Sequence, residues 1–307
     1  METVNPFTQR FLIEPKRQTT WGIPHAFWFT AMGIGGALYL NEVIFGIEVG
    51  RVLGRSVAHL LSLALIGVGG LVLIADLGRP TRFLQAFRNV RRSWITWGAI
   101  CDFVFLVLDV LYILPTFTWT DGTRPLSGMP TGPGTALGAA LAAVAGVAAF
   151  VVIIYPGMVL ATSRAIPFWN TMLIPLQFLA FAHASALGIV FLAGPAAAGG
   201  PVVLSAVLLT LLSLLAMGTH LLNAHYGRDA GRESLRALLR GSLAPVFLAG
   251  VAGVGLIAPL ALGLVALNGA GGAAGGAALA AMGVFLLAGN FCSKLSVIRA
   301  GRFAPLI

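Results

Sequence analysis

Charged residues are scarce in this sequence. Asp, Glu, Lys and Arg make up 9% of the 307 residues, hydrophobic residues make up 58%, and the mean hydropathy is +0.93. Because soluble domains carry roughly a quarter charged residues, this composition excludes an ordinary water-exposed surface and predicts a membrane protein. A soluble repeat protein rich in Gly and Ala is the weaker alternative.

Cysteine is nearly absent as well. The two cysteines, Cys101 and Cys292, lie in different apolar segments, so they can form neither a disulfide framework nor a four-thiolate iron–sulfur site. Any iron–sulfur cluster must therefore belong to a partner protein. No cleavable signal peptide is apparent, because residues 1–20 are polar and partly charged, and we expect the first apolar run to act as the insertion signal.

Apolar runs of about 20 residues, the length that crosses a bilayer, predict transmembrane helices. Eight such runs lie near residues 24–48, 56–77, 92–114, 134–160, 167–193, 201–223, 242–268 and 274–298. Turn-forming residues separate them, as in the glycine-rich run at 269–276. The sequence therefore predicts an all-α integral membrane protein of about eight transmembrane helices, with both termini on one side.

The basic residues are distributed unevenly between the two sides of the membrane. Sixteen of the nineteen Lys and Arg residues fall on the side of the termini, called side A, and the opposite side, called side B, holds Arg51, Arg55 and Arg124. By the positive-inside rule, side A and both termini should be cytoplasmic. Alternatively, the arginines of side A bind a partner subunit. This distribution, rather than a nucleic acid partner, accounts for the net charge of +9.

Three groups of motifs lie on side A. The first group is Ala-Asp-Leu-Gly-Arg-Pro at 75–80, followed by Arg-Arg-Ser-Trp at 91–94. The second is Tyr-Pro-Gly at 155–157, followed by Pro-Phe-Trp-Asn at 167–170. The third is Val-Ile-Arg-Ala-Gly at 297–301. In helix number, motif order and motif position, the whole chain resembles the NrfD/PsrC family, the membrane subunits of polysulfide-reductase-like complexes. The Asp-Leu-Gly-Arg-Pro block with its Arg-x-Ser-Trp is the most specific of these motifs.

The resemblance implies an architecture and a function. The helices should form two four-helix bundles, residues 1–165 with the quinone site and residues 166–307. The protein should bind a quinone, menaquinone or ubiquinone, and carry no haem or iron–sulfur cluster of its own. An iron–sulfur subunit should dock on side A and link the protein to a molybdopterin catalytic subunit. Such complexes act in anaerobic respiration, in the prokaryotic cytoplasmic (inner) membrane.

The quinone site is expected near side A, within the first four helices. The resemblance and the chemistry of the side chains select His25, Asp76, Arg79 and Tyr155. A phenol or an imidazole can hydrogen-bond a quinone oxygen, and a histidine can also pass a proton. The alternatives are a structural pair between Asp76 and Arg79, and interfacial anchoring by His25 and Tyr155. His220 and His225 are expected at the interface or facing a partner rather than in a site.

Several polar side chains are predicted deeper in the membrane, where ionisable groups are rare. They are Glu42, His59, Asp102, Asp109, Gln177 and His183. Together they could form a proton path from side B to the quinone. The alternative is a set of interhelical hydrogen bonds that fix the bundle, and the residues alone slightly favour this structural role.

Two other functions stay open at this point. A proton-coupled secondary transporter would use intramembrane carboxylates to bind its coupling ion, but the loops are compact and no clear inverted repeat is present. A cytochrome b-type subunit needs paired axial histidines at equal depth, and His59 and His183 could both lie near side B.

Overall fold

The protein is almost entirely helical. The computed structural model describes residues 15–76, 93–194, 199–268 and 272–304. The long helices are α1 (Ile23–Phe45), α2 (Val57–Asp76), α4 (Trp94–Ile113), α5 (Ala136–Ala161), α6 (Leu173–Ala193), α7 (Gly200–Tyr226), the π-helix η6 (Pro245–Ile257) with its continuation α9 (Ala258–Leu267), and α10 (Gly272–Ala300). The short elements are η4 (Leu114–Thr116), α8 (Asp229–Leu239) and a hairpin of β1 (Arg51–Val52) and β2 (Arg55–Ser56).

Seven of the helical spans among these residues are long and apolar enough to cross a membrane. The other long helix, α1, has 23 residues and is therefore roughly 35 Å long, which also suffices for a bilayer. Its residues 31–41 are buried without interruption, because α2, α5, α6 and α10 pack around it. The prediction of an all-α membrane protein with about eight transmembrane helices is confirmed.

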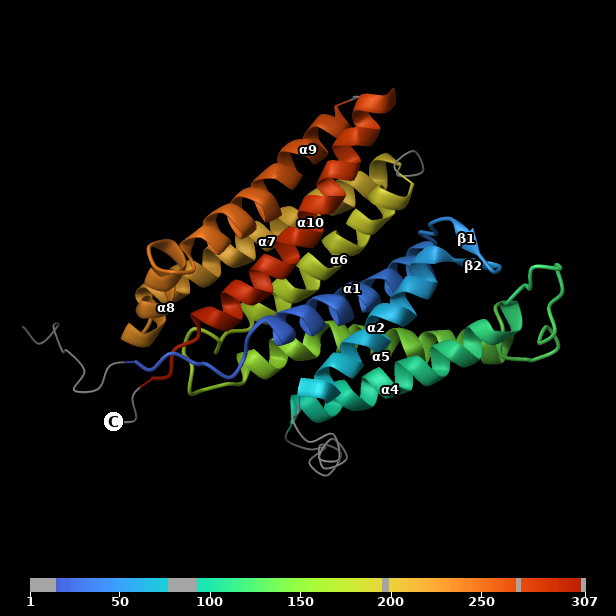
Figure 1. Ribbon diagram of the computed structural model, residues 1–307, viewed down its shortest axis with the longest axis horizontal. Coiled ribbons are helices and arrows are strands. Elements are labelled where there is room, and N and C mark those ends of the chain that lie inside the picture. Colours follow the sequence, from blue (N-terminus) through green and yellow to red (C-terminus); the bar gives the residue numbers. More distant parts are fainter. Residues whose placement is uncertain (1–14, 77–92, 195–198, 269–271, 305–307) are drawn as a thin grey trace, which may run out of the picture.

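The helices fall into two neighbouring groups, seen side by side in Figure 1. The first contains α1, α2, α4 and α5, the second contains α6, α7, α9 and α10, and α1 and α5 pack against α6 across the boundary. A division of the sequence into bundles of residues 1–165 and 166–307 stays a prediction.

Glycine allows α1 to approach two neighbours closely. A Cβ atom on Gly35 would lie 2.9 Å from Ser62 O of α2, and one on Gly36 would lie 2.9 Å from Ala149 O of α5. Real side chains do not tolerate these distances to backbone atoms, so only glycine fits at either position. Small residues serve this purpose in many membrane helix pairs.

Both described ends of the protein lie at side A, as predicted. Gln18 N donates to Gly301 O at 3.1 Å, and Phe303 N donates to Lys16 O at 2.8 Å. In Figure 1 this end carries α8 and the C-terminus, whereas the β1–β2 hairpin lies at side B.

Two helix predictions need correction. Residues 167–172 do not belong to α6, because they form turns in which Trp169 Nε1 donates to Val297 O at 2.8 Å and Asn170 Nδ2 donates to Ala161 O at 2.6 Å. The apolar runs also did not predict α8, which follows α7 on side A. Its buried residues Ala230, Ser234, Leu235 and Leu238 lie on one face and its arginines lie on the other.

The contact between η6 and α10 generates the first prediction. A Cβ atom on Gly289 would collide with Gly255 Cα of η6, so Gly289→Ala should push the two helices apart and lower the free energy of unfolding by about 1–3 kcal/mol. Thermal unfolding of the detergent-solubilised protein measures the effect. Gly218→Ala is the matched control, since a Cβ atom there would meet nothing within 4 Å; equal midpoints for both variants would contradict the close contact.

Candidate functional site

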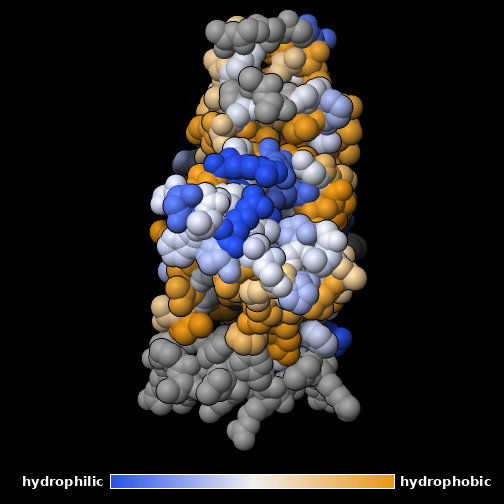
Figure 2. Space-filling view, turned by 90° about the vertical axis from the view of Figure 1, so that its right-hand side faces the viewer, coloured by the Kyte–Doolittle hydropathy of each residue, from blue (hydrophilic) through white to orange (hydrophobic). Residues whose placement is uncertain are grey.

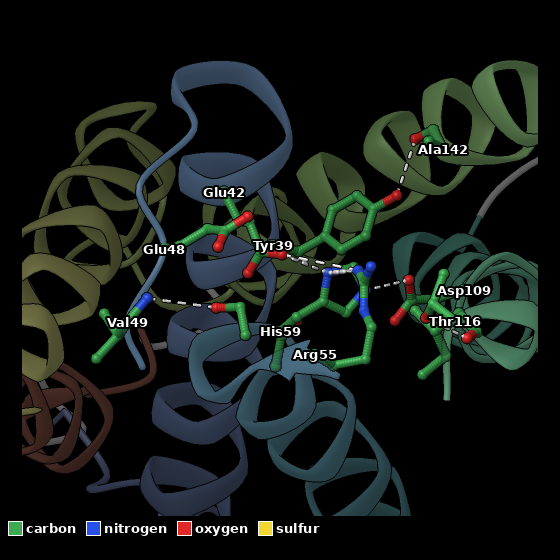
Figure 3. A network of polar contacts seen from close by, with 12 residues as sticks. Tyr39, Glu42, Glu48, Val49, Arg55, His59, Asp109, Thr116 and Ala142 are labelled. Atoms are coloured by element: carbon green, nitrogen blue, oxygen red, sulfur yellow. Dashed lines mark hydrogen bonds and ion pairs between the residues drawn. The ribbon is translucent and has the colours of Figure 1, made fainter. Parts of the chain in front are cut away.

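Four ionisable side chains form a buried cluster near side B, called here the His59 network: Glu42, Arg55, His59 and Asp109. His59 Nε2 lies 2.7 Å from Asp109 Oδ1, and His59 Nδ1 lies 3.0 Å from Glu42 Oε1 (Figure 3). Arg55 Nη2 lies 3.7 Å from Glu42 Oε1. The four side chains are 0–12% exposed. The fold thus joins three of the predicted path residues, from α1, α2 and α4, with an arginine from β2.

The geometry of the His59 network fits two protonation states. Carboxylate oxygens can only accept hydrogen bonds, so contacts of both ring nitrogens with carboxylates describe an imidazolium whose charge, with that of Arg55, balances Glu42 and Asp109. Arg55 Nη2 also lies 3.0 Å from His59 Nδ1. When Nδ1 loses its proton, it can accept from Arg55 while Nε2 still donates to Asp109. The network can hold or release a proton without leaving a ring nitrogen unpaired.

A polar cavity connects the His59 network with side B. It has a volume of about 390 Å³, and its charged lining residues are Glu42, Glu48, Arg51, Arg55, His59 and Arg124. Figure 2 views the molecule from the end that carries the hairpin, where hydrophilic surface is concentrated in the middle and apolar surface surrounds it. Water at side B can therefore reach the network.

Apolar residues close the His59 network toward the middle of the membrane. Phe105 lies one turn before Asp109 on α4 and is 0% exposed, as is Ile66 of α2. The Tyr39 ring packs edge-on against Phe105, with centroids 5.0 Å apart, and its hydroxyl donates to Ala142 O at 3.0 Å. The network therefore opens to side B and is covered by hydrocarbon on the inner side.

A second group of side chains lies near side A, called here the Tyr155 cluster: Trp21, His25, Trp28, Met32 and Tyr155. His25 is half-buried and stacks on Trp21 with centroids 5.0 Å apart, and Trp28 lies 6.3 Å from His25 and 5.9 Å from Tyr155. Tyr155 is 0% exposed, and its hydroxyl contacts Met32 Sδ at 3.5 Å. Two of the predicted quinone ligands, His25 and Tyr155, thus flank one indole ring.

Asp102 lies beside the Tyr155 cluster rather than in the His59 network. A Cβ atom on Gly98, one turn before Asp102 on α4, would collide with the Tyr155 ring, and one on Gly70 of α2 would lie 2.6 Å from Asp102 Oδ2. Asp102 Oδ1 is buried and has no hydrogen-bond partner among the described residues. A carboxyl group with a buried, unpartnered oxygen is costly to ionise, and such groups in membrane proteins are often functional.

The other predicted residues lie elsewhere. Asp76 is the last residue of α2 and its side chain, like all of Arg79, lies outside what the structure describes. Gln177 Nε2 lies 3.1 Å from His220 Nδ1, and His220 Nε2 lies 2.8 Å from Phe168 O. His220 is 1% exposed, so it is covered by the protein and does not face a partner, and its bond to Phe168 keeps it near side A. His183 contacts Asn41 instead of the His59 network.

Comparison with known proteins decides the family. The family model described as "Polysulphide reductase, NrfD" matches residues 12–305, which is nearly the whole sequence. The protein belongs to the NrfD family. It is also similar to one subunit of the polysulfide reductase of Wolinella succinogenes, with 26% identity over 314 aligned positions that cover 94% of this protein and 96% of the relative.

In this NrfD-family protein, sequence reasoning missed two buried cations. Arg55 was assigned to the surface of side B. Lys294 was counted among the basic residues of side A, but it is 1% exposed, donates to Asn290 Oδ1, and lies 4.9 Å from the centre of the Phe178 ring. The spacing of Asn290 and Lys294 by four residues was the available signal, since it places both on one face of a helix.

The hydrogen bonds of the histidines argue against a cytochrome b-type subunit, in which a pair of histidines binds the haem iron. Both ring nitrogens of His59 face carboxylates, and His183 Nδ1 bonds Asn41. Within the described part of the protein, no group of three or more His, Cys, Asp or Glu side chains could hold a metal ion.

The His59 network generates a prediction about stability. Arg55→Gln removes one of two buried positive charges and leaves two carboxylates with His59, so the free energy of unfolding should fall by on the order of 3 kcal/mol. Arg51→Gln is the matched control, because the Arg51 side chain is 64% exposed and pairs with exposed Glu48; its cost should stay below about 1 kcal/mol. Thermal unfolding compares the two, and equal losses would argue against a buried network.

Proposed function

We propose that this NrfD-family protein is the membrane subunit of a multi-subunit redox complex. It exchanges two electrons and two protons between a membrane quinone, menaquinone or ubiquinone, and an iron–sulfur partner subunit. The Wolinella relative is named as one of the chains of a polysulfide reductase, which supports a complex of several subunits. The two cysteines of this protein lie in separate helices, α4 and α10, so the electron carrier belongs to the partner.

The observation that carries this proposal is the Tyr155 cluster with Asp102 beside it. The Tyr155 hydroxyl now faces a thioether, which is a weak acceptor, so a quinone carbonyl would be the better partner for it. Trp21 stacks on His25 and Trp28 on Tyr155, so a quinone headgroup held by His25 and Tyr155 would be surrounded by aromatic rings. When bound, the quinone supplies the electron chemistry, and His25 and Tyr155 hold its headgroup. Asp76 and Arg79 are proposed to complete the site from the end of α2.

The partner subunit is proposed to dock on side A. Four arginines, Arg228, Arg232, Arg236 and Arg240, are exposed there along α8 and its ends. The apolar face of α8 packs against α7, α10 and η6, which fixes the helix at the membrane surface. An iron–sulfur subunit with acidic side chains fits this surface and would bring its cluster toward the Tyr155 cluster. A molybdopterin catalytic subunit is proposed to bind that subunit in turn.

Tyr155→Phe tests the quinone site. The substitution removes one hydroxyl, whose hydrogen bond to a neutral acceptor contributes about 0.5–1.5 kcal/mol, so turnover of the complex with a quinone analogue should weaken about threefold to tenfold while assembly stays intact. Tyr226→Phe serves as the control, because Tyr226 is 80% exposed at the end of α7. If turnover is unchanged in Tyr155→Phe and also in a His25→Leu variant, the quinone binds elsewhere.

We propose that protons are exchanged locally at side A, through Asp102, while the His59 network has a structural role. Asp102 and Asp109 are roughly 10 Å apart along α4. Phe105, fully buried, lies between them on the same face of the helix. The polar residues first considered as one path therefore support separate groups rather than one conduit.

A pair of variants distinguishes local exchange from a conduit. Asp102→Asn keeps size and much hydrogen bonding but loses the titratable group, so quinone turnover should fall about tenfold or more. Glu42→Gln should leave turnover within about twofold. Complexes reconstituted in vesicles should generate no membrane potential during turnover. A potential that appears in the unmodified complex and disappears in Glu42→Gln would establish the conduit instead.

The protein is proposed to reside in a prokaryotic cytoplasmic membrane with side A in the cytoplasm. Removing the two buried cations, Lys294 from side A and Arg55 from side B, leaves fifteen basic residues on side A against two on side B, so the bias still supports this orientation. Alkaline phosphatase fused after Ile307 should be inactive. An active fusion would place side A, and the docked partner, outside the cytoplasm.

A further inference from the structure

A groove opens toward the lipid in the side B half of the molecule, away from the Tyr155 cluster. It has a volume of about 710 Å³ and lies between the last turns of α1, the middle of α6 and the first turns of α7. Its rim is apolar and exposed, with Ile44 63%, Phe45 69% and Leu208 55% exposed. This volume is in the range of small-molecule sites, and its position gives direct access from the bilayer.

The groove has a polar pair among its lining residues, Asn41 of α1 and His183 of α6. His183 Nδ1 lies 3.0 Å from Asn41 Oδ1. An amide oxygen can only accept, so Nδ1 carries the proton and Nε2 of the neutral ring offers a lone pair. Asn41 is 4% exposed, and its Nδ2 has no partner in the part of the protein that the structure describes. The pair therefore offers one donor and one acceptor to a ligand.

These groups define the chemistry of the ligand. None of the lining residues is charged, so a phosphate headgroup would find no counter-charge at this depth. Ser205 also lines the groove, but its hydroxyl donates to Pro201 O at 2.8 Å within α7. A hydroxyl on a neutral ring matches the polar pair, since its hydrogen can be donated to His183 Nε2 while its oxygen accepts from Asn41 Nδ2. A carbonyl could use only the amide.

We propose that the groove is a second site for an isoprenoid quinol, with its hydroxyl on Asn41 and His183 and its isoprenoid tail along the apolar rim. The site is distinct from the Tyr155 cluster, because Met32 and Asn41 are roughly 14 Å apart along α1. It shares only the ligand class with the proposed function and involves no electron transfer. An unpartnered amide donor in hydrocarbon costs free energy, and the quinol hydroxyl removes that cost.

Titration with 2-heptyl-4-hydroxyquinoline N-oxide, a fluorescent quinol analogue quenched on binding, tests the groove in the purified complex in nanodiscs. The unmodified complex should bind two molecules per membrane subunit. The double variant, Asn41→Leu with His183→Phe, should bind one molecule per membrane subunit. Because this variant removes both polar partners together, neither is left unpaired, which limits the cost to folding. Ser205→Ala is the control and should still bind two. A thermal midpoint checks that each variant is folded.

The outcomes separate this inference from the proposed function. Two bound molecules in the double variant would overturn the groove site. One molecule in the unmodified complex, lost in His25→Leu but kept in the double variant, would also overturn it and leave the Tyr155 site standing. One molecule lost only in the double variant would support the groove and reject the Tyr155 site.

As a check that needs no substitution, a photoreactive azidoquinol should label residues 201–212 in the unmodified complex. Labelling confined to side A would overturn the groove site.

Discussion

The structure depends on the burial of α1 among other helices. A polar side chain on such a helix is covered by protein on most sides and takes its hydrogen-bond partner from a neighbouring helix. Between residues 39 and 42, three side chains of α1 find partners on three different helices: Tyr39 bonds to α5, Asn41 to α6, and Glu42 to α2. Successive residues point about 100° apart on a helix, so these contacts fix the rotation and depth of α1 and of the helices around it.

The two ends of α1 consequently have different characters. At side A, aromatic rings and a thioether surround Tyr155, and the nearest carboxyl group, Asp102, has no charged partner among the described residues. At side B, Glu42 belongs to a balanced set of four charges that meets water through a polar cavity. One end is suited to a neutral aromatic ligand, and the other holds charge.

Much of the fold could be predicted from the sequence, because apolar runs of bilayer length leave few alternatives. The helices, their order and the common side of both ends followed from hydropathy and turn residues. Pairing between side chains could not be predicted in the same way. Asn41 and Glu42 are neighbours in the sequence but belong to different clusters. Lys294 looks interfacial in the sequence but is buried, with its amine over the Phe178 ring of α6. The grouping of Asp102 with Tyr155 depends on two glycines, whose importance appears only when the helices are packed.

The last helix closes the structure that the first helix begins. Gln18 Nε2 donates to Ile298 O at 3.0 Å across a separation of 280 residues, and Trp169, which packs against Trp21 at 5.7 Å, donates to Val297 O. At about 5–20 residues per second, translation takes on the order of tens of seconds to cover that distance. During this time the side A end of α1 is in the membrane without its final neighbours. Completion of synthesis is thus a timing step in biogenesis, and an interrupted polypeptide cannot present a finished side A surface to a partner.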